Sequence, residues 1–207
     1  MYDFLFKTVL LGDEGVGKST ILASYNFDKL FKDIEPTIGV DFFTTLVHWN
    51  KKKIKLQVWD CAGNSSYQSI ISSYFNTVVA AIIVFDLSNY NSFKNVENWI
   101  NSFNKFSQKY SYILVVGNYI DGTVKVKDEE IRKLCNKYKT RYVQVNSSNV
   151  DSVKKMFLQL SEVILEENRL NPEWYRNNQG FKNTSNYTHF YNIDEHPPSK
   201  CCSCVIL

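Results

Sequence analysis

The pattern of hydrophobic and polar residues divides most of this chain into short apolar runs and longer amphipathic segments. The apolar runs predict six strands, at residues 4–11, 39–49, 53–59, 78–85, 112–116 and 141–145. Residues 78–85 and 112–116 are apolar throughout, which is typical of parallel strands covered on both faces. In 53–59, Ile54, Leu56 and Val58 alternate with polar residues, as in a half-covered strand.

The amphipathic segments carry apolar residues three or four positions apart and predict helices at residues 19–26, 92–106, 128–137 and 150–167. The clearest is 92–106, where the apolar stripe consists of Phe93, Val96, Trp99, Ile100 and Phe103. Strands that alternate with helices predict a doubly wound α/β sheet, whose ligands bind at the carboxyl ends of the strands.

A complete phosphate-binding loop of the form G-x-x-x-x-G-K-S lies between the first strand and the first helix. Its residues are Gly12, Asp13, Glu14, Gly15, Val16, Gly17, Lys18 and Ser19. The backbone N–H groups of such a loop point at phosphate oxygens, and the start of the helix adds the positive end of its dipole. Lys18 supplies a charge for the β- and γ-phosphates, and the Ser19 hydroxyl can ligate Mg²⁺.

Other polar residues follow the predicted strands. Thr37 lies in a loop that can fold over a γ-phosphate, and Asp60 comes at the end of a strand. Asn118 and Asp121 follow the strand 112–116. A carboxylate at Asp121 can accept both donors of the guanine edge, a pair that adenine lacks, which favours GTP over ATP. An ATP-using enzyme remains an alternative, and it requires that Asp121 does not read guanine.

These motifs together resemble the Ras superfamily and, within it, the Rab branch. Residues 36–42 look like the Rab switch I signature, and 59–63 (WDCAG) resemble its W-D-T-A-G. Residues 72–74 and 85–99 are also similar to Rab sequences. The resemblance is collinear over residues 4–167. It implies a P-loop NTPase of the Ras-like G-domain type at residues 1–170, with a mostly parallel six-stranded sheet and helices on both faces.

The resemblance also implies the roles of individual residues. Lys18, Ser19 and Thr37 would serve phosphate and Mg²⁺, Asp60 the water shell of the metal, and Gly63 the γ-phosphate. Asn118 and Asp121 would read guanine, and the loop at Ser147 and Ser148 would contact its oxygen. The implied effector region is Ile34, Glu35, Pro36, Thr37, Ile38, Gly39, Val40, Asp41 and Phe42. The implied partners are Rab-type effectors, an exchange factor, a GTPase-activating protein and the prenylation machinery, and the implied role is a GTP/GDP switch in vesicle traffic.

Four positions depart from the family pattern. Asn64 stands where the family has its catalytic glutamine, and the missing methylene retracts the carboxamide by about 1.5 Å, a misplacement that can cost about 10²-fold in rate. Glu14 places a carboxylate near the γ-phosphate and an incoming arginine finger. Tyr119 replaces a lysine that packs over the base, and Asn149 replaces the lysine of S-A-K. We therefore expect slow hydrolysis, with Asn64 and Thr37 as the catalytic residues. The alternative is an effector platform that binds GTP with little or no turnover.

The end of the chain carries a second signal. From residue 171 the periodic pattern dissolves into Asn, Ser and Tyr, which predicts a flexible tail at 171–207. Its last four residues, Cys204 to Leu207, fit a C-a-a-X prenylation box, and the terminal leucine favours geranylgeranyl. One lipid chain anchors only marginally, so Cys201 or Cys202 is expected to carry a second. We expect a lipid-anchored protein on the cytoplasmic face of a membrane, with a cytosolic pool.

Composition narrows the picture further. A net charge of +3 spread over 207 residues gives no electrostatic basis for binding nucleic acid. We find no signal peptide and no apolar run as long as a membrane span. Three features have simple structural interpretations: Cys61 as a small buried side chain, Asp86 as the cap that begins a helix, and the run Lys51, Lys52 and Lys53 as a solvated hairpin tip.

Overall fold

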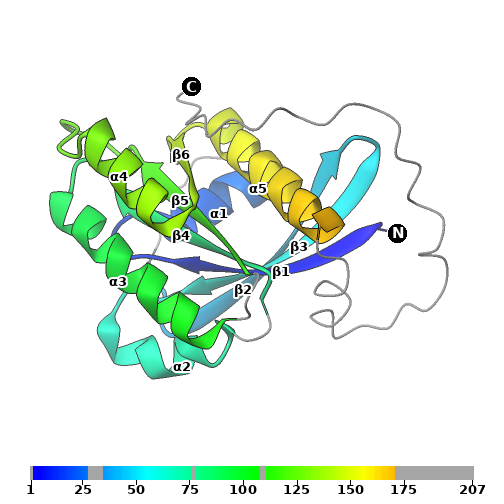
Figure 1. Ribbon diagram of the computed structural model, residues 1–207, viewed down its shortest axis with the longest axis horizontal. Helices are drawn as coiled ribbons and strands as arrows, with labels where there is room; N and C mark the ends of the chain where they lie inside the picture. Colours follow the sequence, from blue (N-terminus) through cyan, green and yellow to red (C-terminus); the bar gives the residue numbers. More distant parts are fainter. Residues whose placement is uncertain (1, 28–34, 76–77, 108–110, 171–207) are drawn as a thin grey trace.

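The structure is a computed structural model that describes residues 2–27, 35–75, 78–107 and 111–170. In chain order its elements are β1 (Phe4–Leu11), α1 (Lys18–Phe27), β2 (Val40–Trp49), β3 (Lys52–Cys61), the 3₁₀ helix η1 (Ser65–Tyr67), α2 (Gln68–Ser72), β4 (Ala80–Asp86), α3 (Tyr90–Phe106), β5 (Tyr112–Asn118), α4 (Asp128–Tyr138), β6 (Arg141–Val145) and α5 (Val150–Leu170) (Figure 1). The predicted tail, the lipidation cysteines and Ile34 lie outside the described residues.

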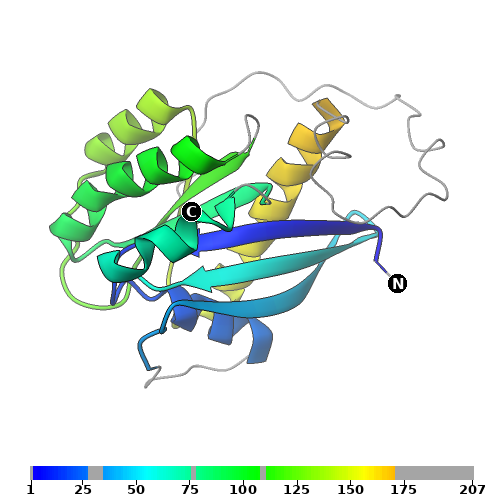
Figure 2. The ribbon, with the colours of Figure 1, turned by 90° about the horizontal axis from the view of Figure 1, so that it is seen from below.

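The strands form one sheet in the order β2-β3-β1-β4-β5-β6. β2 pairs with β3 in antiparallel register, and the pairings of β1 with β3, β1 with β4, β4 with β5 and β5 with β6 are parallel. Figure 2 shows β1 and the β2–β3 hairpin running side by side. The predicted mostly parallel, six-stranded α/β sheet is confirmed.

Helices cover both faces of the sheet, and each face has its own hydrophobic core. On one face, α1 and α5 pack through side chains such as Leu22 and Phe157 against Phe6 and Leu10 of β1. On the other face, α2, α3 and α4 contribute Ile71, Trp99, Phe103 and Ile131. The apolar stripe predicted for 92–106 is the buried face of α3. The sheet is therefore held rigidly between two layers, and its loops are left to carry function.

The expected helix cap at Asp86 is wrong. The cap of α3 lies three residues later, where the side-chain oxygen of Asn89 accepts hydrogen bonds from the N–H groups of Asn91 (3.1 Å) and Ser92 (3.3 Å). The Asp86 carboxylate instead accepts from the N–H (2.8 Å) and hydroxyl (2.9 Å) of Ser88. It closes the short loop that precedes the helix.

Of two simpler expectations, the burial of Cys61 is confirmed, and the hairpin tip is confirmed at Lys51 but not at Lys52 and Lys53, which already belong to β3. Cys61 is fully buried, and the hairpin turn exposes Lys51, with Asn50 and Lys51 in the left-handed region at φ +44° and +62°. Within the described ranges, no helix has both the length and the apolar character that crossing a membrane requires.

Candidate nucleotide-binding site

The parallel topology brings the predicted site residues to one edge of the sheet. The carboxyl end of β1 leads into the phosphate loop, the end of β3 carries Asp60, and β5 ends at Asn118. β2 runs in the opposite direction, so its start, which follows Thr37, lies at the same edge, with Val40 opposite Cys61. Residues far apart in the sequence therefore meet at this edge.

Lys18 lies inside the phosphate loop. Its ammonium donates to the carbonyls of Gly12 (2.9 Å) and Asp13 (2.7 Å), and only 6% of the residue is exposed. Burial lowers the pKa of this ammonium, and the nearby Asp60 opposes that shift. A phosphate would add negative charge beside a cation that is poorly solvated, so the loop suits an anionic ligand.

Asn118 joins the phosphate loop to the loop after β6. Its side-chain amide donates to the Val16 carbonyl (3.0 Å) and the Ser147 hydroxyl (3.2 Å), and its oxygen accepts from the Ser147 N–H (3.0 Å). Gly17 permits this approach, because a Cβ there would lie 2.3 Å from the Asn118 amide nitrogen, and its φ is +87°. Both amide donors of Asn118 bond within the protein, so the side chain fixes the two loops relative to each other.

Three oxygen-bearing side chains gather next to Lys18. The Ser19 hydroxyl donates to Asp60 Oδ2 (2.6 Å) and lies 2.9 Å from the Thr37 hydroxyl, which is 3.3 Å from the same carboxylate oxygen. Burial raises the pKa of Asp60, and hydrogen bonds from Ser19 and the charge of Lys18 oppose the shift.

The other oxygen of this carboxylate, Asp60 Oδ1, is buried and has no hydrogen-bond partner among the described residues. A hydrated Mg²⁺ beside the hydroxyls of Ser19 and Thr37 would give that oxygen donors and stabilise the ionised carboxylate. The residues present therefore fit a magnesium ion.

Gly63 lies against the backbone of the phosphate loop. A Cβ at Gly63 would lie 2.2 Å from the Glu14 nitrogen and 2.3 Å from the Asp13 carbonyl carbon, so only glycine fits. Glu14 itself is exposed at this point. The start of the β3–α2 segment and the phosphate loop thus form one surface.

Asn64 is exposed, and its side chain is engaged locally. Its oxygen accepts the Ser66 N–H at 2.9 Å, and its carbonyl accepts the Tyr67 N–H, which begins η1. A side-chain oxygen that bonds the backbone two residues later is characteristic of Asn and Asp, because longer side chains do not close this ring well. The carboxamide therefore serves the turn in this conformation.

The loops after β5 and β6 contain the expected base-reading residues. Asp121 and Ser148 are exposed and Ser147 is buried. Tyr119 is half-buried, and its hydroxyl donates to the Gly122 carbonyl (3.1 Å). Asn149, at the position of the family lysine, accepts the Ser152 N–H (3.1 Å) at the start of α5.

Asp13 has a different environment from that expected for a phosphate-loop side chain. Its carboxylate accepts the indole N–H of Trp99 (2.8 Å) and the amide of Asn95 (2.7 Å), both on α3. Its backbone carbonyl accepts a hydrogen bond from the Lys18 ammonium. Sequence reasoning missed Asn95 and used Trp99 only in the apolar stripe of the helix and in the Rab-like pattern.

Part of the expected effector region forms an exposed apolar surface. Ile38 is 83% exposed and Phe42 44% exposed. Phe42 packs on Trp59 with ring centroids 4.7 Å apart, and Trp59 packs on Tyr74 at 4.9 Å.

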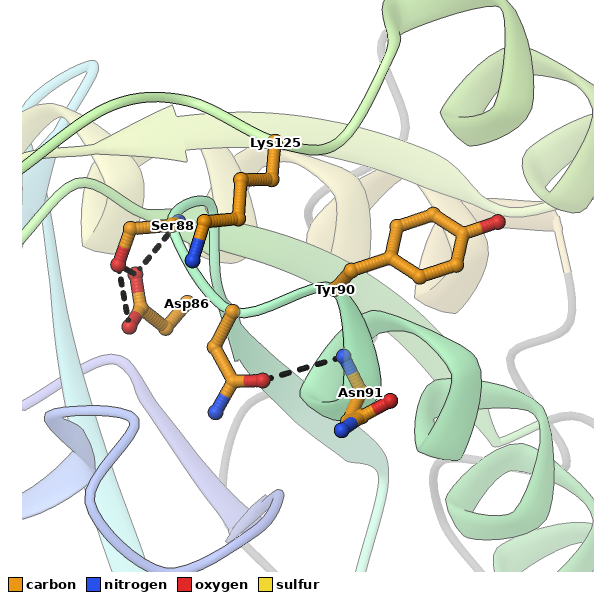
Figure 3. A pocket seen from close by; sticks show the side chains of 6 residues that line it. Asp86, Ser88, Tyr90, Asn91 and Lys125 are labelled. Carbon is orange, nitrogen blue, oxygen red and sulfur yellow. Dashed lines mark hydrogen bonds between the residues drawn. The ribbon is translucent and has the colours of Figure 1, made fainter.

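A cavity of about 430 Å³ opens beside this site, between the start of α3 and the β5–α4 loop (Figure 3). Its lining residues are Asp86, Ser88, Asn89, Tyr90, Asn91 and Lys125. Figure 3 shows the Ser88 hydroxyl and N–H bonded to the Asp86 carboxylate, so the acidic group is satisfied within the protein. No phosphate-loop residue lines this cavity.

Comparison with known proteins decides the family. Residues 7–166, most of the chain, match the model of the Ras family. The chain belongs to the Ras family. Relatives with Rab-type names include the Ras-related protein RABA6b of Arabidopsis thaliana, 33% identical over 188 residues that cover 86% of this chain and 82% of the relative. The Ras-related protein SEC4 of Candida albicans is 32% identical over 168 residues (80% of each chain). The GTP-binding protein ypt3 of Schizosaccharomyces pombe is 35% identical over 158 residues (75% and 74%). The chain is thus a divergent Rab-type member of the family.

Proposed function

We propose that this Rab-type protein is a GTP/GDP switch with slow intrinsic hydrolysis that acts in membrane traffic. The observation that carries the proposal is the meeting of Ser19, Thr37 and Asp60 beside the buried Lys18 at one edge of the sheet. Lys18 and the loop N–H groups bind the β- and γ-phosphates. Ser19 and Thr37 hold Mg²⁺, and Asp60 holds its water shell. When bound, the ion neutralises charge on the phosphate oxygens.

Guanine selectivity is assigned to Asp121. The Asp121 carboxylate is exposed in the loop after β5 and accepts no hydrogen bond from the other described residues. Burying it against guanine gives it two N–H donors, whereas adenine would leave it unpaired. The relative ypt3 is named a GTP-binding protein, which supports the assignment. Asn118 contributes by holding the Ser147 loop against the phosphate loop.

Slow hydrolysis rests on Asn64. In the family the residue at this position orients the attacking water, and we place Thr37 and Gly63 at the same γ-phosphate end of the site. The Asn64 side chain is both shorter than glutamine and bonded to the Ser66 N–H. Orienting water requires that this bond be given up, and the Glu14 carboxylate stands where an arginine finger would enter.

The same two residues favour a second candidate function, a GTP-bound platform with little or no turnover. The exposed Ile38 and Phe42 would serve effectors in either case. Single-turnover release of the γ-phosphate, with and without a Rab-type activating protein, separates the two candidates. A switch gives release that the activator accelerates; a platform gives none.

Attachment to a membrane completes the proposal. We assign residues 1–170 to the G domain and 171–207 to a tail that carries geranylgeranyl on Cys204 and a second lipid on Cys201 or Cys202. Prenylation machinery, an exchange factor and an activating protein are the required partners. These lipids would hold the protein on the cytoplasmic face of a membrane, with a cytosolic pool.

Competition against labelled GDP tests the core of this proposal. GTP should displace the label at a concentration more than about 10³-fold below that of ATP, because the two base edges differ in donors. Asp121→Ala should abolish most of that preference, and Asp128→Ala, an exposed aspartate in the first turn of α4, should keep it. Equal competition by ATP and GTP against the parent chain would refute guanine recognition.

A further inference from the structure

Two hydrogen-bond donors on α3 hold the side chain of Asp13, a residue of the phosphate loop. Trp99 donates its indole N–H to one carboxylate oxygen of Asp13 (2.8 Å), and Asn95 donates its amide to the other (2.7 Å). Asn95 and Trp99 are four residues apart and so lie on the same face of the helix. Both oxygens of Asp13 are therefore occupied, and the phosphate loop is tied to a helix more than eighty residues further along the chain.

These hydrogen bonds are chemically specific. An indole N–H only donates and an ionised carboxylate only accepts, so neither partner can reverse its role. Trp99 is 6% exposed, and Asp13 and Asn95 are half-buried, so water competes weakly for these groups. A hydrogen bond to a charged group in such surroundings is stronger than one between neutral groups.

We call the hydrogen bonds from Trp99 and Asn95 to Asp13 the clamp. The backbone of Asp13 connects this clamp to the ligand side of the loop. Its carbonyl accepts the Lys18 ammonium at 2.7 Å. The peptide that follows it, between Asp13 and Glu14, is the surface against which Gly63 lies, since a Cβ on Gly63 would be 2.2 to 2.7 Å from these atoms. Any shift of Asp13 therefore moves both the carbonyl that accepts from Lys18 and the peptide against which Gly63 packs.

α3 also touches the segment that follows Gly63. Phe103 packs edge-on against Phe75, with ring centroids 5.3 Å apart, and Ile71 of α2 lies in the same hydrophobic cluster as Trp99. One helix therefore contacts the two segments that would flank a γ-phosphate. It contacts the phosphate loop through Asp13 and the α2 segment through its own apolar face.

We propose that Trp99 and Asn95 are positioning residues that set the preference of this site for GTP over GDP by clamping the Asp13 carboxylate. The inference rests on the proposed guanine-nucleotide switch. With the clamp intact, Lys18 and Gly63 keep the relative placement that a γ-phosphate needs. Without it, the Asp13–Glu14 peptide relaxes, and the contacts to the γ-phosphate weaken more than those to the β-phosphate.

The test measures dissociation of labelled GDP and of a labelled non-hydrolysable GTP analogue from the parent and from Trp99→Phe, Asn95→Ala and Asp13→Asn. Phenylalanine keeps the buried ring but removes the donor. Release of the GTP analogue should accelerate about tenfold in Trp99→Phe, and release of GDP by less than about threefold, as expected for the loss of one hydrogen bond to a charged group. The double variant Trp99→Phe with Asp13→Asn should be no worse than Asp13→Asn alone.

Matched controls are Trp49→Phe, at the far end of β2, and Asn104→Ala, exposed near the end of α3. Both should release the two nucleotides at parental rates. Should Trp99→Phe fail to fold, the half-buried Asn95→Ala carries the test alone. Equal acceleration of both nucleotides, or full additivity in the double variant, overturns the positioning role while leaving the switch intact. A parent chain that binds neither nucleotide overturns the switch and this inference together.

Discussion

Asn64 shows at the scale of one residue how a missing methylene changes what a carboxamide does. The shorter side chain closes a ring onto the Ser66 N–H, beside the backbone bond from the Tyr67 N–H to the Asn64 carbonyl that begins η1. Its position after Gly63 was predictable from the motif. Its hydrogen bond was not, because the motif says nothing of the backbone turn that follows.

Asn64→Gln should raise the single-turnover rate of γ-phosphate release by about 10- to 10²-fold, since the carboxamide regains its reach and leaves the turn. Adding Glu14→Gly should help further when an arginine-donating activator is present, and the two effects should be non-additive because they act on one transition state. Asn64→Ala is the control and should stay at or below the parental rate. If the parent already hydrolyses as fast as the double variant, Asn64 positions water adequately and our interpretation of this residue is wrong.

Cys61 should be inert in the folded protein. Burial raises its pKa to about 12, so the thiol stays protonated near neutral pH, and the thiolate is the reactive form. In a variant with serine at Cys135, Cys201, Cys202 and Cys204, a maleimide should label Cys61 only on addition of denaturant. Because the folded state keeps this proton, the stability that the thiol contributes should be lost as pH rises from about 9 toward 12. Rapid labelling of the native protein at pH 7 would contradict the burial.

At the scale of elements, α3 illustrates what a pattern can and cannot predict. Its buried stripe followed from apolar spacing, since a helix that faces a sheet must carry one. Its start did not, because Asp86 and Asn89 are both residues that cap helices, and only the backbone path selects Asn89. The short helices η1 and α2 were missed for a related reason: their few residues show no full period, and Ile71 holds them through packing.

Replacing the cap should cost a measurable part of the stability. Asn89→Ala should lower the free energy of unfolding by about 1 kcal/mol, because the N–H groups of Asn91 and Ser92 lose their acceptor. Asn89→Asp should retain most of it, and Asn91→Ala, at the exposed neighbouring position, serves as the matched control. The measurement is urea denaturation of each variant, fitted with one common dependence of the unfolding free energy on urea concentration. An unchanged midpoint in Asn89→Ala would mean that packing alone fixes the start of the helix.

The site was predictable as far as topology dictates it. Ser19, Thr37 and Asp60 meet because the parallel strands β1 and β3 end at the edge where the antiparallel β2 begins. The contact between Asp13 and Trp99 depends on how α3 is rotated on the sheet, which no local pattern encodes. No local pattern encodes the bond of Asn118 to the phosphate loop either, and it emerged only from the structure.

At the scale of the whole molecule, we propose that a nucleotide-binding domain is followed by a tail that carries lipid. Residues from 171 onward carry no net charge, so they offer little of the roughly 1 kcal/mol that each basic residue gains near anionic lipid. A single lipid chain holds only marginally. Anchoring should therefore need two modified cysteines.

Fractionation in a eukaryotic cell that supplies the transferases measures this requirement. Cys204→Ser should leave the protein in the soluble fraction, and Cys201→Ser with Cys202→Ser should leave it divided between soluble and membrane fractions. Cys135→Ser, which changes a buried cysteine of the G domain, should not alter the distribution. Stable membrane retention of the Cys204→Ser form would overturn the prenylation assignment and point to acylation or a protein partner.

The central claim is that the strand ends of this fold form a guanine-nucleotide site, and the nucleotide that co-purifies with the protein tests it most directly. The full chain is purified in Mg²⁺ without added nucleotide and denatured, and the released nucleotide is identified and quantified by ion-exchange chromatography and mass spectrometry. We predict close to one guanine nucleotide per chain. A substantial share should be GTP, because a site with Asn64 in place of glutamine hydrolyses GTP slowly. A preparation that carries adenine nucleotide, or one that carries none and takes up neither GDP nor GTP, would contradict the account.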